Sequence, residues 1–308
     1  MSVSPAAGPV PALEHASVGA PINRMGVSLF PVYVHQPLGQ RIRTGREAGF
    51  SIAEADDETV PTLVASNLGA EPLLLVEGET LAGGLQQRTL NVSVLMGAHR
   101  TVAVPVSCVE AGRWGGSRDF SGSTGQTIRR VRRAKAETVR NSVRRTGDKL
   151  SDQAAVWDSV DRELELKAAP SPTRNLADAE VVFERSGDLA AALEELVGTG
   201  PLPGQCGVVV GHGSRVVSAE VFADADMFAA HWEPIVRASL LDRPARLKGR
   251  PSASRALGFL RRMAKEPAVE TEGVDLGRER HLESRRLVGQ ALTWADRLVH
   301  ASAFALAA

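Results

Sequence analysis

The sequence predicts an α+β fold with a β-rich N-terminal third, central helices and C-terminal hairpins that return to the sheet. Short runs of alternating apolar and polar residues dominate residues 27–107, as half-buried strands require. Apolar residues at helical spacing recur between residues 126 and 198. Terminal strands usually join a sheet that already exists, so we expect a single α+β domain over residues 13–308. A Pro- and Ala-rich tail over residues 1–12 is predicted to be disordered.

The composition argues against several classes of protein. The 308 residues include 36 Lys plus Arg and 36 Asp plus Glu, so no net charge attracts nucleic acid or a membrane. Aromatic residues make up only 4%, which also argues against nucleic acid as a partner. The chain has no apolar run of about 18 residues and no basic, then apolar, leader at its N-terminus. We therefore expect a soluble, cytoplasmic protein without a membrane segment.

Metal and disulfide chemistry find little support. Cys108 and Cys206 are too few for a disulfide framework. The seven histidines are scattered, and no pair stands at metal-ligand spacing beside a carboxylate. No metal site is predicted, and the cofactor is left open.

The first strands are predicted at residues 27–34, 59–67 and 72–76, each bounded by turn residues. The acidic stretch 49–58 is interpreted as a solvated connection or strand end rather than a metal site, because loops that bind hard metals alternate their ligands and include glycine.

Residues 77–114 concentrate the polar chemistry of the chain. Alternating runs at 90–96 and 101–107 flank a turn at 97–100, which predicts a hairpin. Pro105 cannot donate to a ladder, so the second strand should be an edge or contain a bulge. The hairpin would bring the residues before Leu90 close to those after Ser107. The polar side chains that converge in this way are Gln86, Arg88, Cys108, Glu110, Arg113 and Trp114.

This cluster has two interpretations. In the first, Arg88 or Arg113 pairs with Glu79 or Glu110 and caps the sheet, with Trp114 as a core anchor. In the second, the cluster is a pocket in which the guanidinium groups grip an anion and the indole stacks on a ring. The candidate ligand-binding residues are then Glu79, Gln86, Arg88, Arg113 and Trp114.

A Gly/Ser-rich loop at 116–126 follows, which is either a lid or a plain connector. Residues 126–149 predict a basic helix, with nine Lys or Arg against Glu137 and Asp148, a local charge of +7. Its apolar stripe favours a core-facing helix with a solvated basic face, and the alternative is an anion-facing or docking surface.

Helices are predicted next at 152–168, 176–185 and 188–198. Strands on both sides of the turn at 211–214 predict a second hairpin, and strands around 294–296 predict a third. The remaining helices are expected at 225–241, kinked at Pro234, and at 252–265.

Four motifs together resemble an uncharacterised bacterial family. They are GETLAGGLQQR at 78–88, PVSCVEAGRW at 105–114, GVVVGHGSRVVSAEVFADADMFAAHW at 207–232 and VHASAF at 299–304. The family is named for genomic association with ADP-ribosylglycohydrolases and rhodanese-phosphatase superfamily proteins, and the resemblance covers roughly residues 14–305. It implies a link to ADP-ribose or nucleotide metabolism through gene neighbourhood, not through chemistry. The signature positions that it implies are Gly83, Gly84, Gln86, Arg88, Cys108, Glu110, Arg113 and Trp114.

Three functional hypotheses follow. The first is a binding module for a small anionic ligand, related to ADP-ribose or a nucleotide, at the cluster in 77–114. The second is a hydrolase or transferase with Glu110 as general base or Cys108 as nucleophile, although no histidine stands at a telling distance from Cys108. The third is a scaffold that docks a protein partner through the basic helix at 126–149.

Overall fold

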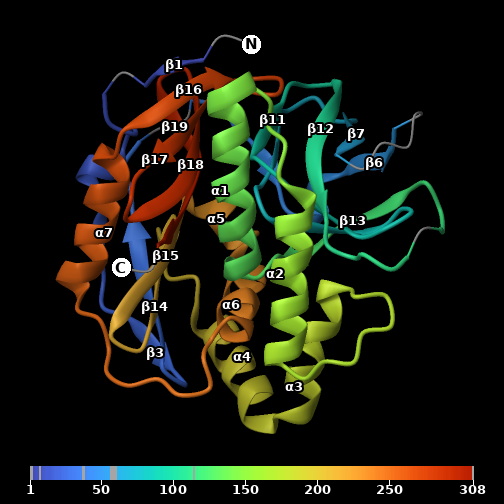
Figure 1. Ribbon diagram of the computed structural model, residues 1–308. Helices are drawn as coiled ribbons and strands as arrows, with labels where there is room; N and C mark the ends of the chain where they lie inside the picture. The colour runs from blue at the N-terminus through green and yellow to red at the C-terminus, as the bar shows by residue number, and fades with distance from the viewer. Residues whose placement is uncertain (1–2, 7, 37–38, 56–60, 114, 307–308) are drawn as a thin grey trace. The chain divides into compact units, whose positions relative to one another are not determined.

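The computed structural model describes residues 3–6, 8–36, 39–55, 61–113 and 115–306 (Figure 1). Contacts divide the chain into two compact units. Unit 1 contains Arg41–Gly187 and Glu272–Leu276, and unit 2 contains Ser2–Gln40, Asp188–Thr271 and Gly277–Ala308. Strands dominate the N-terminal part, helices the middle, and hairpins the C-terminal part, which confirms the predicted α+β class. The single domain over 13–308 stays a prediction.

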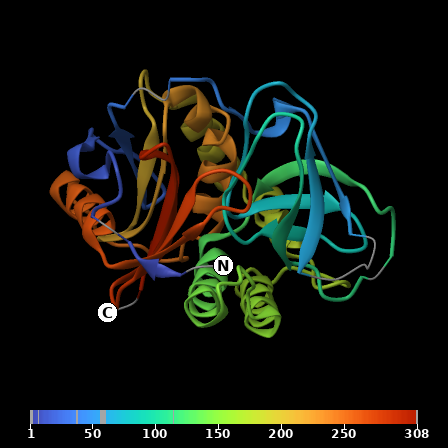
Figure 2. The ribbon, with the colours of Figure 1, turned by 90° about the horizontal axis from the view of Figure 1, so that it is seen from above.

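Unit 1 contains a six-stranded antiparallel sheet in the order β13-β9-β10-β12-β7-β6. Its strands are β6 (Phe50–Glu54), β7 (Thr62–Asn67), β9 (Glu79–Gly83), β10 (Arg88–Leu90), β12 (Thr101–Cys108) and β13 (Phe120–Gln126). The sheet curls until its two edges meet, because Ala53 forms a bridge with Asp119, and the Glu54 amide donates to the Arg118 carbonyl at 2.9 Å (Figure 2). A second sheet has the order β11-β8-β5, from β5 (Arg43–Thr44), β8 (Leu73–Leu75) and β11 (Val94–Met96).

The predicted hairpin at 90–107 is only half right. β10 pairs with β12, with Arg88 opposite Cys108 and Leu90 opposite Val106. The run 90–96 is not one strand, however, since β11 leaves this sheet and pairs with β8. Asn91 and Ser93 cause the break: they are buried, and their side chains bond the main chain of Val106 and of Glu77 rather than facing water.

Two helices of unit 1 lie side by side (Figures 1 and 2). They are α1 (Arg129–Thr146) and α2 (Gln153–Leu166), and Asp152 caps α2 by accepting from the amides of Ala154 and Ala155. The helix predicted from residue 126 thus begins at Arg129. The predicted loop 116–126 is also different, because Phe120–Gln126 forms the edge strand β13 with register shifts on both sides of Ser123. The 3-10 turns η2 (Arg46–Ala48) and η3 (Leu176–Glu180) and the helix α3 (Val181–Arg185) complete the unit.

Unit 2 is built on a ten-stranded sheet, counted over the described residues, in the order β1-β16-β17-β18-β19-β15-β14-β4-β2, with β3 also paired to β4. The strands are β1 (Ser4–Pro5), β2 (Ser17–Val18), β3 (Ile22–Arg24), β4 (Val27–Tyr33), β14 (Gly207–His212), β15 (Arg215–Phe222), β16 (Ala268–Glu272), β17 (Arg278–Glu283), β18 (Leu287–Trp294) and β19 (Arg297–Ala305). Both predicted C-terminal hairpins, β14–β15 and β18–β19, are confirmed. Within the predicted N-terminal tail, Ser4–Pro5 pairs with β16, and Val10 is buried.

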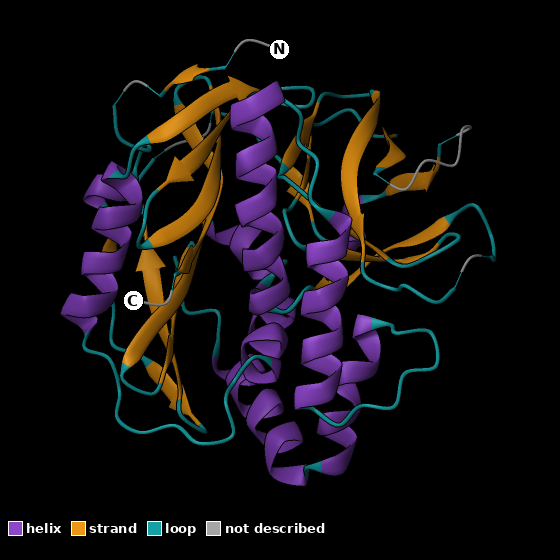
Figure 3. Ribbon diagram, in the orientation of Figure 1, coloured by secondary structure: helices purple, strands orange, loops and turns teal. Residues whose placement is uncertain are grey.

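The core of unit 2 lies between one face of this sheet and α7 (Ala253–Lys265), the outer purple helix of Figure 3. The core residues from α7 include Phe259, Leu260 and Met263. The other elements are η1 (Leu13–His15), α4 (Gly187–Thr199), α5 (Ala225–Ala229) and α6 (Trp232–Leu241). The predicted kinked helix 225–241 is therefore two helices, and Pro234 lies in the first turn of α6, where its missing N–H costs nothing.

No helix among the described residues is long and apolar enough to cross a membrane. The same part of the chain contains no group of three or more His, Cys, Asp or Glu side chains that would hold a metal ion.

Candidate functional site

The candidate site centres on Arg88, whose side chain is fully buried in the curled sheet of unit 1. Its Nη1 donates to Gln86 Oε1 at 3.1 Å and to Cys108 Sγ at 3.0 Å. Its Nη2 lies 3.7 Å from Glu54 Oε1 on β6, and both side chains have no exposed surface. β10 and β6 are separated by two strands in the sheet order, so the curl of the sheet brings this pair together.

The buried pair of Arg88 and Glu54 is incompletely hydrogen-bonded. Glu54 Oε1 accepts from the Leu85 amide at 2.9 Å, whereas Glu54 Oε2 has no hydrogen-bond partner among the described residues. The Nε and Nη2 atoms of Arg88 likewise have no acceptor within the described part of the chain. Buried polar atoms are nearly always satisfied in folded proteins, so these three atoms are the candidates for contact with a bound group or an ordered water.

Cys108 is part of this centre as a buried thiol. Its single S–H has two acceptors within reach, Gln86 Oε1 at 2.8 Å and the Glu110 carbonyl at 3.2 Å. Burial raises the pKa of the Cys108 thiol, and this effect outweighs the nearby Arg88 charge, which acts in the opposite direction. A nucleophilic cysteine needs a lowered pKa and access to substrate, so the environment of Cys108 does not favour that role.

We expect Cys108 to resist alkylation in the folded protein. In a Cys206→Ser variant, iodoacetamide at pH 7.5 should label Cys108 far more slowly in the native state than in denaturant, because the thiol is both buried and protonated. Mass spectrometry of quenched samples measures both rates. Native labelling as fast as that of the unfolded chain would restore the nucleophile hypothesis.

Glu110 and Arg113 form an ion pair next to this centre. Glu110 Oε2 accepts from Arg113 Nε at 2.9 Å and from the Gln87 amide at 3.1 Å, and Oε1 accepts from Thr173 Oγ1 at 2.9 Å. Burial alone would raise the pKa of Glu110, but the bonds from Arg113, the Gln87 amide and Thr173 prevail and lower it. Glu110 is therefore held as a carboxylate, which makes it a weak base.

The guanidinium group of Arg113 also donates hydrogen bonds to main-chain carbonyls. Nη1 donates to the carbonyls of Gly84 and Gly115 at 2.8 Å each, and Nη2 donates to the Gly83 carbonyl at 3.2 Å. Together with the bonds to Glu110, these contacts occupy the whole fork of a side chain that is 32% exposed. Arg113 thus ties the β9–β10 turn to the segment after β12, and its pair with Glu110 is one that the structural interpretation named.

Residues 115–120 cover the same turn. The Gly84 amide donates to the Asp119 carbonyl at 3.1 Å, and the Gly115 amide donates to the Leu85 carbonyl at 3.2 Å. Gly84 has φ +59°, and a Cβ there would lie 2.1 Å from the Phe120 ring, so only glycine fits beneath this residue. The stretch predicted as a lid or connector is therefore packed over the residues next to Arg88.

The family model described as "ARG and Rhodanese-Phosphatase-superfamily-associated Protein domain" (ARPP-1) matches residues 15–304. The chain belongs to this family. The match confirms the resemblance seen in the sequence motifs. No curated protein and no solved structure matches the chain.

Five of the candidate residues named from the sequence motifs lie together in unit 1. Gln86, Arg88, Cys108, Glu110 and Arg113 form one connected set of contacts. Glu79 is buried on β9, where its Oε2 accepts from the Val76 amide at 3.1 Å. Trp114, predicted to stack on a ligand, lies outside the described residues.

Sequence reasoning missed two carboxylates of unit 1. Glu54, assigned to a solvated connection or strand end, does end the strand β6, but it is 4% exposed and faces Arg88. Its place two residues after Ile52, on the apolar side of an alternating run, was the available signal. Glu77 is fully buried and binds Lys135 Nζ at 2.8 Å and Arg132 Nη2 at 2.7 Å.

The basic helix α1 is consequently less solvated than predicted. Arg132 and Lys135 turn inward to Glu77, and Arg130 donates to Glu163 of α2 at 2.7 Å. Arg144 and Arg145 are exposed at its C-terminal end, where cations complement the helix dipole. Docking of a partner through this helix stays a hypothesis.

Proposed function

We propose that unit 1 is a binding module for a small acidic ligand, with Arg88 and Glu54 as the residues that contact it. One observation carries the proposal: Arg88 Nε, Arg88 Nη2 and Glu54 Oε2 are buried without a hydrogen-bond partner among the described residues. Leaving such atoms unsatisfied costs about 1–3 kcal/mol for each group. A ligand that satisfies them would recover that free energy on binding.

The unsatisfied atoms constrain the chemistry of the ligand. Arg88 offers donors and therefore requires acceptor oxygens, such as those of a carboxylate or phosphate. Glu54 Oε2 is an acceptor and requires a hydroxyl or N–H group. Since Glu54 balances the charge of Arg88, a ligand with both acidic oxygens and hydroxyls suits the pair better than a bare anion does.

ADP-ribose and ribonucleotides contain both kinds of group. They are also the ligand class towards which the family's description points, through its association with ARG proteins. That association is a fact about genes and adds no chemistry, so these compounds enter as the first to test.

Entry of a ligand requires the segment 115–120 to open. This segment is exposed from Gly115 to Asp119, and main-chain bonds at Gly84, Leu85 and Glu54 hold it down. Opening would break these main-chain bonds and the contact of the Phe120 ring with Gly84, and surface loops of binding proteins commonly open in this way.

Ligand-dependent thermal unfolding tests the proposal. Wild-type protein should be stabilised by ADP-ribose or a ribonucleotide, by about 2.7 kcal/mol at 100 times the dissociation constant. Arg88→Lys keeps the charge but loses the fork, and it should abolish this stabilisation. Arg132→Lys is the matched control, because it alters another buried arginine of the same unit that contacts Glu77, and it should keep the effect.

Each variant is compared with its own ligand-free melting temperature, so a loss of basal stability does not confound the result. A full ligand effect in a folded Arg88→Lys protein would exclude Arg88 as the contact. No effect of any compound on the wild type, NAD and divalent metals included, would mean that water satisfies the pair and that the module binds something else.

A further inference from the structure

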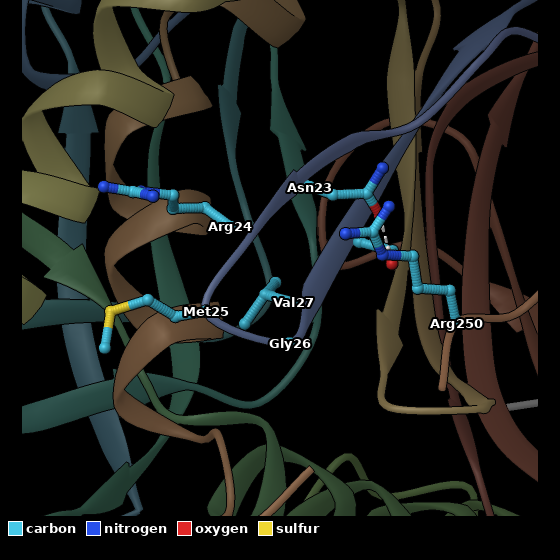
Figure 4. Close-up of a pocket in the computed structure, with 7 residues that line it drawn as sticks. Asn23, Arg24, Met25, Gly26, Val27 and Arg250 are labelled. Carbon is cyan, nitrogen blue, oxygen red and sulfur yellow. Dashed lines mark hydrogen bonds between the residues drawn. The ribbon is translucent and has the colours of Figure 1, made fainter. Parts of the chain in front are cut away.

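Three segments of unit 2 meet at a pocket next to the β3–β4 turn (Figure 4). The β14–β15 turn joins it through the Gly213 amide, which donates to the Gly26 carbonyl at 2.9 Å. The segment 243–252 joins it through Arg243, whose Nε donates to the Met25 carbonyl at 3.1 Å. Gly26 and Gly213 have φ +79° and +57°, and a Cβ on either would lie 2.8 Å from the segment 243–252. This close packing fixes the three backbones around the pocket.

The pocket has a volume of about 160 Å³ and is lined by polar side chains and turn backbone. The lining residues are Asn23, Arg24, Met25, Gly26, Val27, Ser28 and Arg250. Figure 4 shows the guanidinium group of Arg250 beside the amide of Asn23, with Arg24 and Met25 extending away on the other side of the turn. Arg24 is committed elsewhere, to Glu195 at 2.8 Å.

Arg250 is available to a ligand. It is exposed and makes no hydrogen bond or ion pair with any residue that the structure describes. Asn23 beside it is held in place, since its Oδ1 accepts from Ser28 Oγ at 2.6 Å and its Nδ2 donates to the Pro21 carbonyl at 3.0 Å. An amide nitrogen has two hydrogens, so Asn23 retains one donor.

The surroundings of the pocket are strongly basic. Residues 243–255 read RPARLKGRPSASR, with five cationic side chains and no acidic one. Arg246, Lys248 and Arg250 are exposed, and so is Arg215 at the start of β15. The N-terminus of α7 follows at Ala253 and adds its positive dipole end. An overall neutral chain thus concentrates positive potential on one small region.

We propose that this pocket binds the phosphate group of a small phosphorylated molecule. At roughly 30 Å³ per water, the volume holds about five waters, which is the room that one phosphate group with its five heavy atoms needs. The planar fork of Arg250 matches two phosphate oxygens, and Asn23 offers a third donor. Among the described residues, no aromatic side chain lines the pocket to stack a nucleobase, which favours a small phosphorylated ligand over single-stranded nucleic acid.

Calorimetric titration with inorganic pyrophosphate at low salt tests this site. Wild-type protein should bind it, and Arg250→Ala should weaken binding about ten- to a hundred-fold, as loss of a charge-assisted bidentate contact does. Arg261→Ala is the matched control, since it removes the same charge from an exposed position on α7 outside the pocket, and its affinity should stay within about twofold of wild type.

Equal weakening by Arg250→Ala and Arg261→Ala would show diffuse attraction and overturn the proposal. Absence of pyrophosphate binding to the wild type would do the same. Tighter binding of a single-stranded oligonucleotide, with a steep salt dependence, would assign the surface to nucleic acid instead. The unit 1 proposal is tested separately, by ADP-ribose or a ribonucleotide with Arg88→Lys, so failure of that proposal and failure of this one are distinguishable.

Discussion

Glu77→Gln is expected to lower the free energy of unfolding of unit 1 by about 3–5 kcal/mol, because it leaves two buried cations without their carboxylate. Glu77 and Lys135 are fully buried, Arg132 is nearly so, and both cations lie within 2.8 Å of the Glu77 carboxylate. Glu77 also anchors the chain between β8 and β9, where its amide donates to Ser93 Oγ and its carbonyl accepts from Gln126. The substitution therefore disturbs a junction as well as an ion pair.

Native-state hydrogen exchange measures this loss, since it resolves the two units where a single melting curve would not. Glu137→Gln, on the outer face of α1, is the matched control in the same unit. It neutralises a carboxylate that lies 3.7 Å from Arg133 at the surface, and it should cost less than about 0.5 kcal/mol. Equal effects of the two substitutions would contradict a stabilising role for the buried triad.

Because Glu77 titrates, the loss of unfolding free energy caused by Glu77→Gln should depend on pH. Burial would raise the pKa of Glu77, but Arg132 and Lys135 prevail and hold it below its ordinary value of 4.5. A lowered native pKa contributes stability above pH 4.5, and this contribution disappears as the pH falls through the native value. The difference in unfolding free energy between wild type and Glu77→Gln should thus be largest at neutral pH and shrink below pH 4.5.

Arg88→Met is expected to cost unit 1 about 3–5 kcal/mol, since it leaves Glu54 buried without its counter-charge. Glu54→Gln should cost a similar amount by stranding Arg88. The double variant should be more stable than the two losses together predict, with a coupling of about 1–3 kcal/mol. Strict additivity, measured by hydrogen exchange as above, would show that the 3.7 Å contact carries no interaction. A double-mutant cycle at the surface pair Arg133 and Glu137 gives the baseline, and its coupling free energy should be below about 0.5 kcal/mol.

The convergence of Arg88 with Cys108 could be predicted because it depends only on local alternation and on antiparallel pairing of nearby segments. The interruption at Asn91 and Ser93 could not, because their partners on Val106 and Glu77 are main-chain groups that polar periodicity does not reveal. A polar residue that alternates with apolar ones looks the same whether it faces water or a buried amide.

The curl of the unit 1 sheet likewise could not be predicted from the sequence. The curl requires that β13, a Gly/Ser-rich strand without an apolar pattern, pairs with β9 at one edge of the sheet. It also requires that the chain at the start of β13 contacts β6 at the other edge. Backbone bonds rather than side-chain periodicity define that strand. Because the curl brings Glu54 to Arg88, the partner most important for the candidate site stayed hidden, while Arg113 and Glu110, three residues apart, were recognisable.

The most direct test is the ¹H–¹⁵N resonance of the Arg88 side-chain Nε–H, which burial should protect from solvent exchange and which Arg88→Lys identifies by its absence. If Arg88 contacts the ligand, this signal should shift as ADP-ribose or a ribonucleotide is added, and the shift should saturate at the concentration that saturates the thermal stabilisation. A signal that stays in place while such a ligand saturates the protein would contradict binding at Arg88.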